Sequence, residues 1–110
     1  MKKQEIQQIE YRWGMINSVK EASSLPKKIW RGSDIPNDIL LAIKKENLLE
    51  LGGKYGNEFW GDPIEYNQLR IISDKSVIEI EFFNLGIAMF KTDDDVTKRI
   101  FRVLAKLKHS

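Results

Sequence analysis

The sequence predicts a single α+β domain, residues 1–110, in which an antiparallel β-meander packs against helices in the order ααβββα. Two hairpin patterns between Leu69 and Lys91 and an amphipathic helix pattern that ends at Leu107 support this class. Length is the third observation, because a chain of 110 residues can bury a core without metals or disulfides. We therefore expect one domain that folds alone.

A first helix is expected over Lys2–Ala22. Its apolar residues recur at spacings of three and four, as on one face of an amphipathic helix: Ile6, Ile9, Trp13, Ile16 and Val19. Gly14 interrupts this segment, so we expect a kink there or the close packing of another element. Ser23–Pro26 ends the helix, and a loop is expected to continue to Ser33.

A second helix is expected to begin at Ser33 or Asp34 as N-cap, with Pro36 in its first turn. Its apolar stripe consists of Ile39, Leu40 and Ile43. Leu48–Leu51 either completes the helix, with Gly52 as its C-cap, or forms a short strand. We favour the helix.

The first hairpin follows from the alternation of apolar and charged side chains between Leu69 and Phe82, with Ser73–Ser76 as the turn. A register that pairs Ile72 with Val77 gives chemically compatible neighbours. It sets the following residues opposite each other: Ile71 and Ile78, Leu69 and Ile80, Arg70 and Glu79, and Gln68 and Glu81.

A second hairpin is expected around the turn Asn84–Gly86, in a register that pairs Phe83 with Ile87. This register sets three further pairs: Phe82 and Ala88, Ile80 and Phe90, and Glu79 and Lys91. Both hairpins direct Ile80 inward and Glu79 outward, and this agreement supports the predicted sheet.

The last helix is expected to open at the acidic run Asp93–Asp95, which complements the helix dipole and supplies a cap. Its apolar stripe consists of Val96, Ile100, Val103, Leu104 and Leu107. The acidic run could instead bind a divalent cation. No glycine and no distant glutamate accompany it at loop spacing, so capping is the better interpretation.

The composition argues against most catalytic chemistry. The chain has no cysteine, and its one histidine, His109, lies next to the C-terminus, which excludes disulfides, thiol nucleophiles and zinc sites of several imidazoles. Glu79 and Glu81 could form an acid–base pair, but ion pairs of Glu79 with Arg70 and Lys91 explain them better. We predict no catalytic residue, no metal and no cofactor.

No apolar run in the sequence approaches the length of a membrane span, since the longest aliphatic run is Ile39–Ile43. Polar residues follow the N-terminal lysines where a signal peptide would have its apolar stretch. We therefore expect a cytoplasmic protein that does not enter membranes.

Two features favour protein binding. Gly52–Pro63 is expected to be a loop or an irregular edge, and aromatic residues cluster in and after it. The outer sheet face is apolar for a solvated face, so a helix from the first half covers it or a partner binds it. The residues that form this face are Ile72, Val77, Phe83, Ile87 and Met89. The predicted partner-binding residues are Tyr55, Phe59, Trp60, Tyr66, Phe83 and Met89.

The function expected from these patterns is non-enzymatic binding of another protein, as in immunity proteins or adaptor and regulatory modules, or of a second copy through the outer sheet face. The alternative is nucleic-acid binding by the basic N- and C-terminal helices. Residues 1–33 carry seven Lys or Arg against three Glu, and residues 96–110 carry five and no acid. The nucleic-acid candidates on the last helix are Lys98, Arg99, Arg102 and Lys106.

Overall fold

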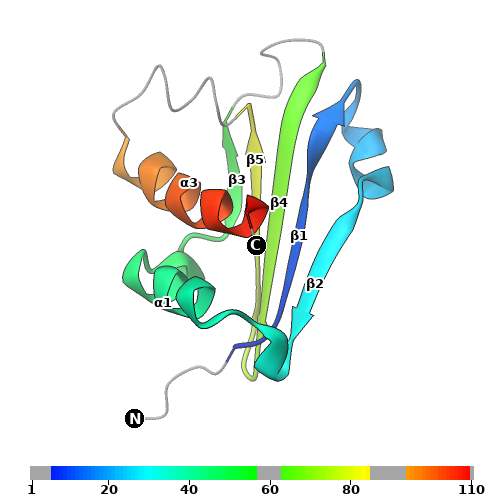
Figure 1. Cartoon of the computed structure of the whole chain (residues 1–110). Coiled ribbons are helices and arrows are strands. Elements are labelled where there is room, and N and C mark those ends of the chain that lie inside the picture. The colour runs from blue at the N-terminus through cyan, green and yellow to red at the C-terminus, as the bar shows by residue number, and fades with distance from the viewer. Residues whose placement is uncertain (1–5, 57–62, 85–93, 110) are drawn as a thin grey trace.

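Two α-helices cover one face of a five-stranded mixed sheet in the described part of the computed structural model, residues 6–56, 63–84 and 94–109 (Figure 1). The strands are β1 (Ile6–Ile16), β2 (Lys27–Arg31), β3 (Gly53–Gly56), β4 (Ile64–Ser73) and β5 (Val77–Phe83). The helices are α1 (Asn37–Lys45) and α3 (Asp95–Lys108), with 3-10 turns η1 (Val19–Ser24), η2 (Gly32–Asp34) and η3 (Leu48–Glu50). The predicted α+β class is confirmed.

The strands lie in the order β2-β1-β4-β5-β3, with every neighbouring pair antiparallel except β3 and β5. The predicted register of the β4–β5 hairpin is confirmed, because Ile72 pairs with Val77 and all four pairs that follow from it are present. The predicted turn closes this hairpin, where the Ser73 amide donates a hydrogen bond to the Ser76 carbonyl at 2.9 Å.

The predicted helix over Lys2–Ala22 is wrong, because residues 6–16 form strand β1. β1 lies between β2 and β4, and both of its faces are contacted, so Ile9, Glu10 and Tyr11 are buried consecutively. Gln8, Glu10 and Arg12 alternate with apolar residues along β1, but the apolar residues Ile6, Ile9, Trp13 and Ile16 also recur at spacings of three and four, which favoured the wrong period. The loop predicted up to Ser33 is also wrong, because it contains β2.

The order of elements along the described residues is therefore ββαβββα rather than ααβββα. The predicted third strand of the meander lies in residues 85–93, outside the described residues, together with its pairs to Ile87, Ala88, Phe90 and Lys91. The edge of β5 that this strand was expected to occupy is taken by β3, which pairs Gly53 with Ile80 in parallel. The meander is thus replaced by a mixed sheet with β3 at its edge.

Gly56 is required at this edge. Its φ is +82°, and a Cβ there would lie 1.9 Å from the carbonyl oxygen of Phe83 on β5. A side chain would therefore prevent β3 from approaching β5. Of the segment Gly52–Pro63, predicted as a loop or an irregular edge, Gly53–Gly56 forms the edge strand β3, and residues 57–62 lie outside the described residues.

Helix α1 differs from the prediction at both ends. Pro36 is its N-cap residue, while Ser33 and Asp34 lie in η2. Asn47 has a left-handed backbone with φ of 57°, which ends the helix before Leu48–Glu50 forms the separate turn η3. Leu48–Leu51 is therefore neither the end of the helix nor a strand.

The main core lies between the helices and the inner face of the sheet, the face that carries Leu69 and Ile80. The apolar stripe predicted for α3 enters this core, with Val96 partly buried and Ile100, Val103, Leu104 and Leu107 fully buried. Asp94 caps α3 by accepting hydrogen bonds from the Thr97 amide and hydroxyl, both at 3.0 Å. No helix among the described residues is long and apolar enough to cross a membrane.

A smaller core lies at one end of the outer face, where η1 covers the sheet. It consists of Ile16, Ala22, Ile64, Tyr66 and Phe83, with Leu25 packed against it. A Cβ on Gly14 would lie 2.6 Å from the Leu25 side chain, so the expected close packing on this glycine is confirmed. The outer face is therefore covered at one end by a segment from the first half of the chain, and the rest has no helix over it among the described residues.

Candidate protein-binding surface

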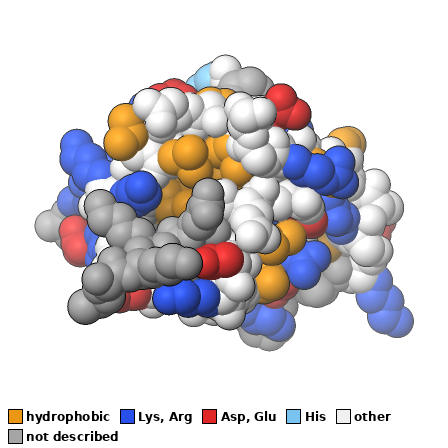
Figure 2. All heavy atoms as spheres, turned by 90° about the horizontal axis from the view of Figure 1, so that it is seen from below, with side chains coloured by type: hydrophobic (Ala, Val, Ile, Leu, Met, Phe, Trp, Pro, Cys, Tyr) orange, Lys and Arg blue, Asp and Glu red, His pale blue; other side chains and the backbone are white. Residues whose placement is uncertain are grey.

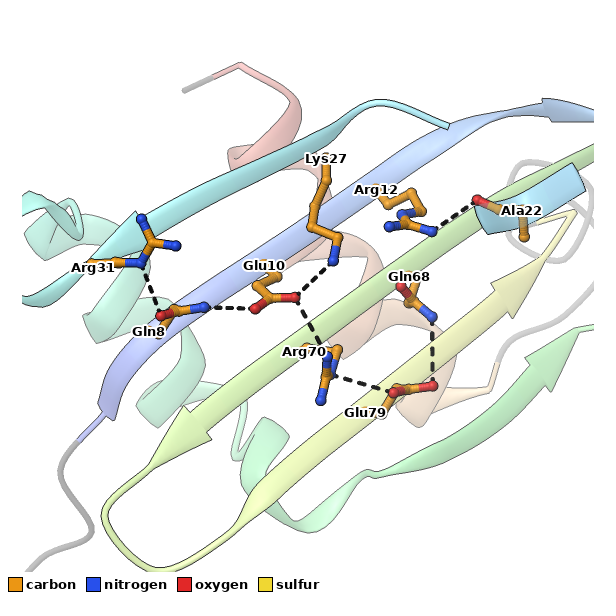
Figure 3. Close-up of polar contacts among 9 residues, drawn as sticks. All are labelled: Gln8, Glu10, Arg12, Ala22, Lys27, Arg31, Gln68, Arg70 and Glu79. Atoms are coloured by element: carbon orange, nitrogen blue, oxygen red, sulfur yellow. Dashed lines mark hydrogen bonds and ion pairs between the residues drawn. The ribbon is translucent and has the colours of Figure 1, made fainter. Parts of the chain in front are cut away.

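The open part of the outer face carries a connected set of polar side chains, which we call the outer-face network (Figure 3). Its members project from β1, β2, β4 and β5, which place them side by side through the observed register. They are Gln8, Glu10, Lys27, Arg31, Gln68, Arg70 and Glu79.

Glu10 is the centre of the network and is only 9% exposed. Its carboxylate accepts hydrogen bonds from Gln8 Nε2 at 2.6 Å and from Lys27 Nζ at 3.2 Å, and Arg70 Nη1 lies 3.6 Å away. Burial alone would raise the pKa of Glu10, but these hydrogen bonds and the two cations outweigh it and lower the pKa. Glu10 is therefore held as an ionised acceptor rather than as an acid that releases a proton near neutral pH.

The network continues on both sides of Glu10. Arg70 Nε lies 3.5 Å from Glu79 Oε2, and Glu79 Oε1 accepts a hydrogen bond from Gln68 Nε2 at 3.5 Å. On the other side, Arg31 Nε donates to Gln8 at 3.2 Å. The charges therefore alternate from strand to strand along the row Lys27, Glu10, Arg70 and Glu79.

Exposed apolar side chains lie beside the network. Ile29 on β2 pairs with Glu10 and is 42% exposed, and Val77 on β5 is 51% exposed. A surface that mixes isolated apolar side chains with charged groups resembles the average composition of non-obligate protein interfaces. Arg12 lies at the border of this surface. Its Nη1 donates a hydrogen bond to the Ala22 carbonyl at 3.1 Å, which holds η1 against the sheet.

The predicted acid pair does not form a free pair of carboxylates. Glu79 contacts Arg70, while Glu81 accepts a hydrogen bond from the Tyr66 hydroxyl at 2.6 Å. Burial, together with this bond and the negative charges of Glu81 and Glu79, raises the pKa of Tyr66. The expected contact of Glu79 with Lys91 lies outside the described residues.

Among the described residues, no group of three or more His, Asp or Glu side chains could hold a metal ion.

Of the residues predicted to bind a partner, the three that the structure describes, Tyr55, Tyr66 and Phe83, do not lie on one exposed surface. Tyr66 and Phe83 are 1% and 4% exposed in the small core beneath η1. Tyr55 is half-buried, stacks on Phe82 with ring centres 5.8 Å apart, and donates its hydroxyl to the Leu51 carbonyl at 2.6 Å. The remaining predicted residues, Phe59, Trp60 and Met89, lie outside the described residues.

Two arginines of the predicted nucleic-acid stripe join the helices to each other. Arg99 donates from Nε and Nη2 to the Glu46 carbonyl at 2.8 and 2.5 Å, and Arg102 Nη1 contacts the Glu46 carboxylate at 2.8 Å. Glu46 follows the last residue of α1, where the helix dipole favours cations. The other two members are half-buried Lys98 and exposed Lys106. Half of the stripe is thus committed to packing α3 against α1.

A small pocket lies elsewhere on the surface, on the helix side of β1 and β2. It has a volume of about 280 Å³ and is lined by Tyr11, Trp13, Pro26, Lys28 and Lys108. Lys108 Nζ lies 4.5 Å from the centre of the Trp13 ring, a cation–π contact. Tyr11 donates its hydroxyl to Asn67 Oδ1 at 2.7 Å at the edge of the core.

The outer-face network was missed at the sequence level on β1 and β2. Segments interpreted as a helix and a loop could not be placed beside β4, so Glu10 and Lys27 had no predicted partners. The alternating polar residues Gln8, Glu10 and Arg12 were the available signal, since they occupy one face of a strand. Only the Arg70–Glu79 contact of this network was predicted, and it is present.

Comparisons of this chain with protein-family models, with curated proteins and with solved structures found no match.

Proposed function

We propose that this chain is a non-enzymatic protein-binding domain whose contact surface is the open part of the outer sheet face. The observation that carries the proposal is the row of alternating charges Lys27, Glu10, Arg70 and Glu79, fixed on the part of the outer sheet face that no described helix covers. Side chains already held in one geometry lose less conformational entropy when a partner binds.

The strands do not need this network to stay together. Backbone pairing already joins β1 to β2 and β4, and β4 to β5, along most of their lengths. The exposed ion pair between Arg70 and Glu79 contributes less than about 1 kcal/mol to stability, and the contacts of Glu10 largely offset the cost of burying its carboxylate. A connected network that adds little to the sheet is better explained by recognition, in which fixed charges select a partner and orient it.

The exposed ends of the network indicate the chemistry of the partner. Arg31 is exposed at one end of the network, where it can bind a carboxylate of a partner. Glu79 is exposed at the other end, where it can bind a Lys or Arg side chain. Ile29 and Val77 supply apolar contact beside them. This mixture suits a protein surface with both charges, as expected for an immunity-protein-like or adaptor function, better than the uniformly negative backbone of a nucleic acid.

The proposal is tested by capture from lysate of the source cells on immobilised wild type and Arg31→Glu, followed by mass spectrometry. We expect the wild type to retain a protein that resists nuclease treatment and Arg31→Glu to retain at least about tenfold less of it, since a favourable charge contact becomes a repulsive one. Equal retention by Arg31→Glu would contradict the proposal, as would retention that nuclease abolishes.

Lys44→Glu is the matched control. It makes the same change of charge at an exposed position on α1, away from the outer face. Net charge alone would weaken capture equally in both variants, whereas the proposal predicts that Lys44→Glu captures as the wild type does.

A further inference from the structure

A groove of about 550 Å³ lies between α1 and α3 on the side away from the sheet. Its apolar lining consists of Leu41, Ala42, Phe101 and Ala105. Leu41 is 58% exposed and Phe101 is 38% exposed, so two large apolar side chains face water here. Figure 2 shows that hydrophobic side chains gather beside Lys and Arg side chains on the face of the molecule seen from below.

The charges on α1 are arranged symmetrically about this apolar surface. Asp38, Leu41, Ala42 and Lys45 are spaced by three, one and three residues and therefore share one face of α1. The point between Leu41 and Ala42 lies midway between Asp38 and Lys45. Within the described part of the chain, neither Asp38 nor Lys45 forms an ion pair.

We propose that this groove is the interface of a homodimer with two-fold symmetry. If the axis passes near the midpoint of Leu41 and Ala42, the two copies of α1 run antiparallel, and Asp38 of each copy faces Lys45 of the other. An isologous interface requires this self-complementarity, in which residue i meets residue j and residue j meets residue i. Leu41 of each copy then enters the groove of the other, against Phe101 and Ala105.

A second copy fits the groove better than an unrelated partner does. The groove is also bordered by Glu46, Arg102 and Lys106, of which Glu46 and Arg102 form an ion pair with each other. On α1, Asp38 and Lys45 present one charge of each sign at matching distances from the midpoint of Leu41 and Ala42. Antiparallel helices also set the positive end of one dipole beside the negative end of the other. Because the contact is small, we expect a weak dimer, with a Kd on the order of 10 to 100 µM.

This inference goes beyond the proposed function, because it concerns the helical face and leaves the outer sheet face open. It differs from the homodimer through the outer face expected from the sequence. A dimer formed through α1 would carry two outer faces, so that a partner displaying two binding sites would be bound more tightly than by one copy.

Sedimentation equilibrium on purified wild type, Asp38→Lys and Lys45→Asp tests the proposal by charge exchange. We expect the wild type to associate with increasing concentration, and each variant alone to associate at least about tenfold more weakly because like charges then face each other. An equimolar mixture of the two variants should associate again, since one chain then carries a cation at both positions and the other carries a carboxylate at both. The double variant Asp38→Lys with Lys45→Asp should also regain association.

A wild type that stays monomeric up to about 1 mM would overturn the inference, since this concentration exceeds the expected Kd by at least about tenfold. Unchanged association in both single variants, or a mixture that does not associate, would overturn it as well. Circular dichroism checks that each variant is folded, and both substitutions lie at exposed positions. Capture of a partner with a single binding site by Lys45→Asp should be unchanged, so a failure here is distinguishable from a failure of the outer-face proposal.

Discussion

On the inner face of the sheet, Leu69 and Ile80 are buried beneath the two helices, whereas on the outer face their neighbours Arg70 and Glu79 form an ion pair beside water. Two nearly buried carboxylates extend this comparison. Glu46 is 8% exposed and binds Arg102 between α1 and α3, and Glu10, 9% exposed, binds the outer-face network.

The cluster around Glu46 and the cluster around Glu10 differ in whether the elements that they connect are already joined by backbone hydrogen bonds. No backbone pairing can join α1 to α3, so the contacts of Arg99 and Arg102 with Glu46 fix one helix against the other. The strands below Glu10 are already joined by their backbones. Similar chemistry therefore stabilises the fold in one place and is available for recognition in the other.

The largest expected effect is on the inner face. Leu69→Ala should lower the free energy of unfolding by about 2 to 5 kcal/mol, because it removes a fully buried side chain and leaves a cavity. Arg70→Ala, one residue along on the outer face, should lower it by less than about 1.5 kcal/mol. Urea denaturation of both variants measures the difference, and equal losses would break the distinction between the two faces.

Arg99→Ala should have the next largest effect. It removes two hydrogen bonds to the carbonyl of Glu46 at the end of α1 and should cost about 1 to 3 kcal/mol of unfolding free energy. Lys98→Ala, at the neighbouring position on α3, is the control and should cost less than about 1 kcal/mol. If the two variants were equally stable in urea, the proposed docking role of Arg99 would be wrong.

Glu10 links stability to pH. Its folded-state pKa lies below the ordinary value of 4.5, so the ionised carboxylate stabilises the fold above about pH 4.5, and this contribution is lost as the pH falls through the folded-state pKa. Glu10→Gln should therefore lose less stability than the wild type between about pH 7 and pH 3. Thermal melts across this range give the comparison; parallel curves for the two proteins would mean that Glu10 is not held ionised by the network.

Glu79→Gln should have the smallest effect on stability. The side chain of Glu79 is 45% exposed and its contact with Arg70 is long, so the change should stay below about 1 kcal/mol. A larger loss in urea would mean that the outer-face network does hold the sheet together.

The parts of the fold that were predicted correctly are those whose contacts are local in sequence. The β4–β5 hairpin has a short turn, and its register follows from matching Leu69 with Ile80 and Arg70 with Glu79. Helix α3 has one apolar face and a capping carboxylate on Asp94, and both signals lie within the segment. In each case the side-chain pattern alone fixes the structure.

The errors arose where burial depends on distant segments. Glu10 is buried among Lys27 and Arg70, and Ile16 beneath η1, both on the outer face, so an apolar residue on that face extends the spacing of Ile9 and Trp13 into a helix-like pattern. The parallel pairing of β3 with β5 depends on Gly56 approaching Phe83, a contact without any local signal. The candidate binding surface could not be predicted for the same reason, because its side chains come together only when β1 and β2 lie beside β4.

The most direct test compares partner capture with stability in two variants of adjacent residues on opposite faces, Arg70→Ala and Ile71→Val. Each should cost about 1 kcal/mol of unfolding free energy, the first from lost ion pairs and the second from a lost buried methyl group. We predict that Arg70→Ala loses the captured protein while Ile71→Val keeps it. Capture that is retained by Arg70→Ala, or lost equally in both variants, would contradict the assignment of the outer sheet face as the binding surface.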